Sequence, residues 1–353
     1  MKLGFAIHTN TRFGLLLAFS WRHLFTSIIA CLLSNAYAIE KELAIPGGSP
    51  KIFWNGTELR ISEKVSISPS PNGEKFAIWK TSPVSPWFGI YSVTTKNLKL
   101  IPLPSKHIWD SARWSYDSTS LVVESYPIVG DAKRETSVTT GITIVDAGMG
   151  TSRVLMRGEG LNGIPFFSRN NKFVYYFHGD LRKEGKTLGA NFSLFRTSVA
   201  NPKAQQLTNI PFYSVSAGEE TADGKAVIFS GIQLNQTAQG RPTGIHVYSL
   251  ATSTLSSISL PLKEISNVRV SSDGSVIFSA TASWRDEHAA YQFEIGKGSQ
   301  ATKLFPLIWQ TGRPARPSKF ELMGRSQILH CWSKDKIENK VGGDTVECRV
   351  YQR

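Results

Sequence analysis

The feature that most constrains this chain is a four-residue pattern that returns at nearly constant spacing. It consists of a hydroxyl residue, any residue, Asn or Asp, and a small or turn-tolerant residue, and we call it the turn tetrad. Asn, Asp and Gly tolerate the left-handed backbone of tight turns, and a Ser or Thr hydroxyl can cap exposed backbone groups. Each tetrad therefore predicts a β-hairpin turn. The copies are Ser70-Pro71-Asn72-Gly73, Ser115-Tyr116-Asp117-Ser118, Ser168-Arg169-Asn170-Asn171, Thr221-Ala222-Asp223-Gly224 and Ser271-Ser272-Asp273-Gly274.

The spacing of the tetrads indicates a repeated structural unit. Their first residues are 45, 53, 53 and 50 positions apart, and each tetrad precedes a β-rich run such as Phe173–Phe177 or Val276–Phe278. A degenerate sixth copy falls near Leu322-Met323-Gly324-Arg325, before the run Gln327–Trp332. Units of this length with several short strands are typical of the blades of a β-propeller.

Six such units fit in the chain, so we predict an all-β, six-bladed β-propeller. The last unit offers only three strands, Lys319–Met323, Gln327–Trp332 and Thr345–Tyr351, whereas spare strands precede the first unit at Lys51–Trp54 and Glu58–Ile61. We therefore expect an N-terminal strand to complete the last blade and close the ring, which removes an exposed sheet edge. The predicted blades span residues 63–104, 107–157, 161–208, 210–260, 263–306 and 318–352.

Two copies of the tetrad carry a resemblance to a known family. Arg113-Trp114-Ser115-Tyr116-Asp117-Ser118 and Thr221-Ala222-Asp223-Gly224-Lys225 are similar to the F-S-P-D-G-K phrase of the TolB-like family of propellers, which are built from WD40-like PD40 repeats. The resemblance covers residues 60 to 333, although no copy keeps the full phrase and the α/β domain that precedes the propeller in TolB itself has no room here. It implies a binding module that mediates protein–protein interactions in the bacterial cell envelope.

The first 38 residues predict a secretory signal peptide. Their formal charges are all positive, the stretch Leu24–Leu33 is largely apolar, and Ala36-Tyr37-Ala38 is a small-residue cleavage site. We expect cleavage after Ala38, which leaves residues 39–353 as a single propeller domain that is periplasmic or secreted, without stable membrane insertion. Two alternatives stay open: an uncleaved membrane anchor, for which the apolar run is short, and a lipoprotein signal at Ile28-Ile29-Ala30-Cys31.

Signal cleavage would leave two cysteines, Cys331 and Cys348. They lie in strand-like runs on either side of the Gly342-Gly343 turn region, and neighbouring antiparallel strands bring such residues close enough to bridge. We predict a Cys331–Cys348 disulfide, which an oxidising compartment would preserve. Two buried free thiols are the alternative.

The charge and the sequence motifs predict neither a nucleic-acid partner nor a cofactor. The mature chain would hold 37 basic and 27 acidic residues, a net charge of +10, but no basic stripe interleaved with aromatic residues occurs. We interpret this charge as a solvated basic surface. The sequence contains no G-x-S-x-G elbow, phosphate loop or H-E-x-x-H motif. The five mature histidines stand at different offsets within their repeats, so we expect structural roles and no metal site for His107, His178, His246, His288 and His330.

The longest loops predict a binding face. They follow the second strand of each repeat and should gather at one end of the propeller, where loops on a rigid scaffold usually bind partners. Their charges are mixed in sign, except in Thr311–Lys319, whose charged residues are all basic. We name as candidate binding residues Arg182, Lys183, Trp284, Arg285, Asp286, Glu287, His288, Arg313 and Arg316.

Three functions compete on this pattern. We favour a non-enzymatic binding module for an envelope protein partner, with no catalytic residue assigned, because a rigid ring with variable loops is a scaffold for recognition. The alternatives are a lyase or hydrolase that acts on a glycan at the mouth of the channel, and a sensor domain for a small ligand. A carbohydrate ligand stays open because aromatic residues stand at strand ends and blade junctions.

Overall fold

The turn tetrads form the hairpin turns that the sequence predicts. In the copy at Ser115, the hydroxyl donates to the Asp117 carboxylate (2.6 Å) and accepts from the Ser120 N–H (2.9 Å). The fourth residue of each tetrad adopts the left-handed conformation that explains the Gly, Asn or Ser found there. Its φ is positive at Gly73, Ser118, Asn171, Gly224 and Gly274.

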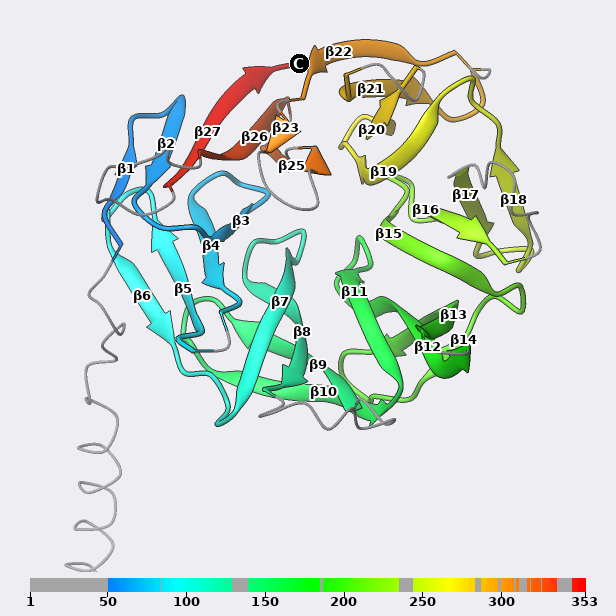
Figure 1. Ribbon diagram of the computed structural model, residues 1–353, viewed down its shortest axis with the longest axis horizontal. Helices are drawn as coiled ribbons and strands as arrows, with labels where there is room; N and C mark the ends of the chain where they lie inside the picture. Colours follow the sequence, from blue (N-terminus) through cyan, green and yellow to red (C-terminus); the bar gives the residue numbers. More distant parts are fainter. Residues whose placement is uncertain are drawn as a thin grey trace, which may run out of the picture. The chain divides into compact units, whose positions relative to one another are not determined.

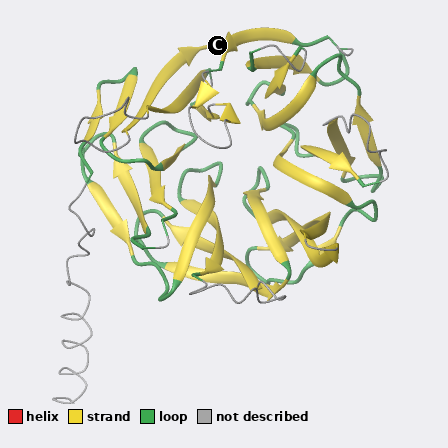
Figure 2. Ribbon diagram, viewed as in Figure 1, coloured by secondary structure: helices red, strands yellow, loops and turns green. Residues whose placement is uncertain are grey.

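The computed structural model describes residues 50–82, 84–128, 139–184, 187–234, 244–282, 287–297, 300–307, 309–310, 316–317, 319–324, 326–334 and 345–353. Every regular element among these residues is a β-strand (Figure 2). None of the described segments is a helix long and apolar enough to cross a membrane. The described strands all lie in the unit Ile45–Arg353.

Three four-stranded antiparallel meanders have the strand order of the sequence. The first contains β3 (Ser66–Pro69), β4 (Lys75–Lys80), β5 (Trp87–Ser92) and β6 (Leu98–Ile101). The second contains β7 (His107–Trp114), β8 (Ser120–Pro127), β9 (Thr139–Asp146) and β10 (Ser152–Glu159). The third contains β19 (Lys263–Val270), β20 (Ser275–Thr281), β21 (Ala289–Glu294) and β22 (Thr302–Pro306).

An eight-stranded sheet combines the strands that the sequence assigns to the third and fourth blades. Its first half contains β11 (Leu161–Phe167), β12 (Phe173–Glu184), β13 (Thr187–Ser198) and β14 (Gln205–Gln206). Its second half contains β15 (Phe212–Glu220), β16 (Ala226–Gln233), β17 (Gly244–Ser249) and β18 (Leu255–Ile258). The halves join because β13 extends past its short partner β14 and pairs Phe192 with Phe212.

The last large sheet has five strands and unites both ends of the described chain. Its order is β1 (Ile52–Trp54), β2 (Glu58–Ile61), β27 (Thr345–Gln352), β26 (Gln327–Lys334) and β25 (Lys319–Met323). β2 pairs antiparallel with β27, with Leu59 opposite Cys348. A short pair, β23 (Trp309–Gln310) with β24 (Arg316–Pro317), precedes this sheet in the sequence.

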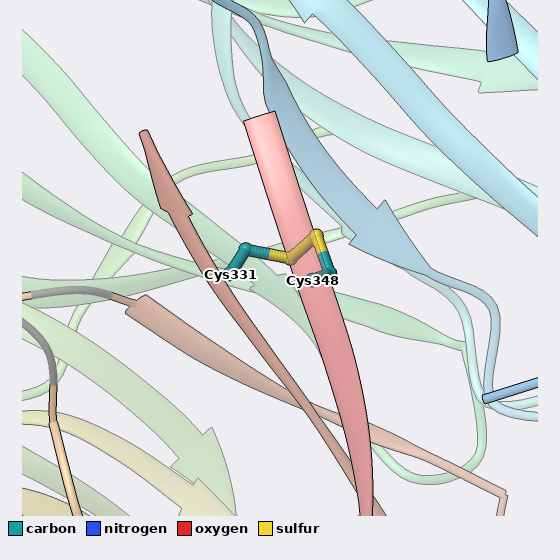
Figure 3. Close-up of a disulfide and its surroundings, with 2 residues drawn as sticks. All are labelled: Cys331 and Cys348. Carbon is teal, nitrogen blue, oxygen red and sulfur yellow. A yellow bond between two sulfur atoms is a disulfide. The ribbon is translucent and has the colours of Figure 1, made fainter. Parts of the chain in front are cut away.

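The predicted disulfide is present. Cys331 of β26 lies directly opposite Cys348 of β27, and the two sulfur atoms are bonded (Figure 3). The bond therefore links the central strand pair of the five-stranded sheet, as expected from two strand-like runs separated by a glycine-containing turn.

The sheets surround a common centre, with β3, β7, β11, β15, β19 and β25 innermost (Figure 1). Aromatic side chains fill the junctions between neighbouring meanders: Phe88 of β5 packs against Trp109 of β7, and Phe305 of β22 stacks on Tyr351 of β27 at 4.6 Å. Burial of aromatic rings makes a large contribution to stability. These contacts agree with the interpretation that aromatic residues at strand ends serve packing between blades.

The prediction of an all-β propeller is confirmed, but its strands do not form six separate four-stranded sheets. Six separate four-stranded sheets were expected, whereas two of the expected blades are continuous and the closing sheet has five strands. The physical reasons are the long β12–β13 hairpin, which reaches the next meander, and the additional N-terminal strand β1.

Candidate functional site

Kinks in the inner strands direct side chains toward the centre of the ring. β7, β11 and β19 each shift register against the following strand. Four positions before the tetrad, each strand has a residue with a φ of 53°, namely Ser111, Ile164 and Asn267. Bulges of this kind bend a strand and re-aim the side chains beside it. The residue two positions before the tetrad then faces the cavity.

The central cavity has a volume of about 470 Å³. It lies at the end of the ring where the tetrads turn, because the second residues of four tetrads line it: Pro71, Tyr116, Arg169 and Ser272. Each of the six inner strands contributes to its wall. The contributions include Ser68, Arg113, Phe166, Glu219, Arg269 and Glu321.

Glu321 of β25 binds two arginines that come from different sheets. Arg269 of β19 makes a bidentate ion pair with it, with N–O distances of 2.6 and 2.7 Å. Arg113 of β7 donates from Nη1 to the same carboxylate at 2.7 Å. Side-chain exposure is 8% for Arg269, 17% for Arg113 and 18% for Glu321. Ion pairs that are this protected from water are strong and position the groups that form them.

A second group of polar contacts crosses the cavity beside this triad. The Tyr116 hydroxyl, on the β7–β8 turn, donates to Glu219 of β15 at 2.9 Å. Glu219 also accepts from the Val270 N–H at 2.9 Å. The Arg169 guanidinium lies 4.2 Å from the centre of the Tyr116 ring and donates to the carbonyl oxygen of Val270 at 2.9 Å. Two inner strands and two turns are therefore held together across the channel.

Burial dominates the electrostatics of the cavity. It lowers the pKa of Arg113, and the neighbouring positive charge of Arg269 lowers it further, against the opposing effect of Glu321. It also raises the pKa of Tyr116 well above its usual value, with Glu219 acting in the same direction. Tyr116 is therefore a hydrogen-bond donor at neutral pH.

A buried carboxylate lies beside the inner strand β7. Glu124 of β8 stands opposite Asp110, and the pKa of Glu124 is raised to about 7 by burial and by the Asp110 charge. The Asp110 carboxylate in turn accepts from the Trp79 indole N–H at 2.9 Å. A Cβ added to Gly163 would lie 3.1 Å from a Glu124 oxygen, so a larger residue there would require the Glu124 carboxylate to shift.

Part of the binding face predicted from the loops is described, and it lies at the other end of the ring from the tetrads. Arg182 and Lys183 belong to β12, opposite Gly189 and Leu188 near the β12–β13 turn. Arg316 belongs to β24, opposite Gln310. Four further predicted binding residues lie outside the described ranges: Trp284, Arg285, Asp286 and Arg313.

Glu287 and His288, which directly precede β21, are the described members of the predicted charged loop. Glu287 is exposed, whereas His288 is buried and shares a hydrogen bond of 2.7 Å with Glu264. Neither of these two described residues lines the cavity. Within the described ranges, no three His, Cys, Asp or Glu side chains converge as metal ligands.

The residues that line the cavity were missed by reasoning from the sequence, although a signal for them exists. Five of them stand two positions before a tetrad, where the inner strand faces the channel: Ser68, Arg113, Phe166, Glu219 and Arg269. The residue type at this position differs between the copies, whereas the turn chemistry repeats. Aligning the copies on the tetrad would have brought Arg113, Glu219 and Arg269 into one column.

No protein-family model matches this chain, and no curated protein matches its sequence. Solved structures nevertheless share its fold. TolB from Acinetobacter baumannii is 14% identical with a TM-score of 0.56, over 86% of this chain and 79% of that chain. The putative TolB from Agrobacterium tumefaciens is 14% identical with a TM-score of 0.54, over 87% of this chain and 100% of that chain.

A propeller from a different kind of protein is also similar. The β-propeller domain of the Trilobed protease from Pyrococcus furiosus is 13% identical with a TM-score of 0.50, over 80% of this chain and 89% of that chain. Identities this low establish a shared fold and leave function to be argued from the site. Together with the sheet arrangement and the repeated tetrads, these likenesses show that the chain folds as a TolB-like β-propeller.

Proposed function

We propose that this protein is an exported binding module that docks a protein partner in the bacterial cell envelope. Its partner would approach the tetrad end of the ring, and the central cavity would anchor it. The proposal includes cleavage after Ala38 and a periplasmic or secreted location. Support comes from the leader-like first 38 residues and from the disulfide, a bond that persists in oxidising compartments.

We also propose that the ring counts six blades and is closed by β2. Six inner strands each begin an antiparallel meander, if the two halves of the eight-stranded sheet are counted separately. β2 pairs with β27, and its side chains Leu59 and Ile61 are buried in a cluster that includes Phe76 of β4. The N-terminal strand therefore contacts both the last sheet and the first, as a closing strand must.

The observation that carries the functional proposal is the construction of the cavity. Its polar groups come from different sheets and are already held by ion pairs and hydrogen bonds, as the Arg113–Glu321 pair shows. A site whose side chains are ordered before binding loses less entropy when a partner arrives. Half-apolar, half-polar lining of this kind suits a projecting segment of another protein.

Site-specific photocrosslinking tests the proposal. A photoreactive amino acid at Ser272 would report on the rim of the cavity, and one at Val84, which is 93% exposed on the β4–β5 connection, would report on the opposite end. We expect a discrete protein adduct in native cell-envelope extracts from the Ser272 probe alone. An adduct from Val84 alone would favour the loop face predicted from the sequence, and no adduct from either probe would contradict a protein-binding role.

A further inference from the structure

We propose that the cavity binds a carboxylate group of its protein partner, and that Arg113 is the residue that holds it. This inference rests on the proposed binding function and names the chemistry of the group that enters. It follows from the charge count of the lining, from the hydrogen-bond donors that remain, and from the shape and polarity of the wall.

The lining carries more positive than negative charge. Its charged residues are three arginines and two glutamates, and the buried carboxylate of Glu220 behind the lining accepts a hydrogen bond from the Arg169 backbone N–H. Both glutamates already accept hydrogen bonds within the network, Glu219 from Tyr116 and Glu321 from two arginines. Because the carboxylates of the lining are engaged in this way, an anion that enters the cavity meets guanidinium groups that can donate to it.

The donors of the three arginines are used unequally. Arg269 donates to both oxygens of Glu321 and to the carbonyl oxygen of Val268 at 2.8 Å, so all three of its nitrogens are engaged. Arg113 makes one hydrogen bond, from Nη1 to Glu321, among the residues that the structure describes. A guanidinium has five N–H donors in a planar fork. Arg113 therefore retains the donors that a second carboxylate needs.

The remaining wall favours a group that is anionic at its tip and apolar behind it. Phe166, Trp114 and Leu322 line the same cavity as the arginines. An acidic side chain, or the carboxyl end of a chain, presents a planar anion on a short hydrocarbon stem, and the fork of Arg matches its two oxygens. The volume of about 470 Å³ admits a residue of this size with its flanking backbone.

Fluorescence anisotropy with defined peptides tests the inference. The probes are fluorescein-labelled hexaglutamate amide, hexaglutamine amide and hexaglutamine with a free C-terminal carboxylate, each titrated with the mature protein at low salt. We expect the glutamate peptide to bind at least tenfold more tightly than the glutamine amide. Comparison of the two carboxylate-bearing peptides separates a side-chain carboxylate from a chain terminus as the preferred source.

Variants assign the interaction to Arg113. Arg113→Gln should weaken binding of the preferred carboxylate peptide at least tenfold, and Arg113→Lys should weaken it severalfold because a single ammonium cannot form the bidentate pair. Lys225→Gln is the matched control: Lys225 is 81% exposed beside a tetrad at the same end of the ring, so it removes one charge without altering the cavity. Its effect should stay below twofold. Thermal melts establish that each variant is folded.

Several results would overturn the inference. Equal affinity for all three peptides would exclude carboxylate recognition, and equal losses for Arg113→Gln and Lys225→Gln would reduce it to general charge attraction. Competition on the wild-type protein gives an answer even if Arg113→Gln fails to fold: displacement of the peptide by inorganic phosphate but not by acetate would assign the site to phosphate. If the Ser272 photoadduct still formed with the Arg113→Gln variant, carboxylate recognition by Arg113 would be excluded, whereas the proposal of a binding module would stand.

Discussion

The two ends of the channel differ in the sequence separation of the residues whose polar side chains pair with each other. At the tetrad end, Arg113 and Glu321 are 208 positions apart in the sequence and bring together β7 and β25. At the opposite end, Glu264 and His288 are 24 positions apart and belong to the same meander. The Arg113–Glu321 pair connects two sheets across the channel, whereas the Glu264–His288 pair stays within one meander.

This difference separates two roles. Side chains that join distant sheets fix the positions of those sheets, so their geometry is set before any partner arrives. Local pairs beside loops do not constrain the ring, and the loops there can vary without disturbing the fold. The tetrad end is therefore suited to recognition that depends on exact side-chain placement, and the loop end to variable surface contacts.

The strongest test of the comparison is to remove one carboxylate from each end. Glu321→Gln leaves two arginines without their shared partner in a protected site, and we expect a loss of about 3–5 kcal/mol in the free energy of unfolding. Glu264→Gln should cost less than about 1 kcal/mol, because the Glu264 side chain is 41% exposed and its pair is partly screened. Urea unfolding followed by tryptophan fluorescence measures both. Similar losses would show that the two ends contribute equally.

A second test concerns the sheet that supplies Glu321. The Cys331–Cys348 bond closes a loop of 17 positions, for which loop entropy predicts about 3 kcal/mol. Replacing both cysteines by alanine should lower stability by that amount while β26 and β27 stay paired through their backbone. We expect the Arg113→Gln effect on peptide affinity to persist in this variant. Its disappearance would mean that the cavity depends on the covalent link.

The pH profile of stability offers a third test. The pKa of Glu124 is raised from 4.5 to about 7 in the folded chain. The folded chain therefore keeps the Glu124 proton up to a higher pH than the unfolded chain does. This contribution is complete below pH 4.5 and is lost as the pH rises through 7, with a total of about 2 kcal/mol after partial exposure is allowed for. Glu124→Gln mimics the protonated form and should flatten the profile between pH 5 and 8. An unchanged slope would exclude Glu124 as its source.

The smallest effect belongs to an exposed pair away from the cavity. His178 lies 3.3 Å from Asp180, whose side chain is 82% exposed. Asp180→Asn should change the free energy of unfolding by less than about 0.5 kcal/mol and leave peptide binding unaltered. A loss above 1 kcal/mol would show that an exposed local pair can matter as much as those that cross the channel.

Sequence reasoning predicted much of the fold because the fold repeats. The tetrads located the hairpins, and the expected strand Glu58–Ile61 coincides with β2. The Cys331–Cys348 bond was predictable because its partners lie in neighbouring strands. The pairing of Arg113 with Glu321 was not predictable in the same way. The offset from the tetrad can mark Arg113 as a residue that faces the channel, but its contact with Glu321 depends on how the ring brings distant sheets together.

The pairing of β2 with β27 has a consequence for how the protein is made. Leu59 and Cys348, which face each other in this pair, are 289 positions apart. β2 is therefore synthesised long before β27 and cannot pair until β27 has been made. Closing so long a loop is entropically costly, and pairing over such sequence separations is slow. A chain that stops before residue 345 would retain nearly every strand but leave β2 as an open edge, exposed to proteases and to other chains. Pairing of β2 with β27 therefore requires that synthesis has passed through β27.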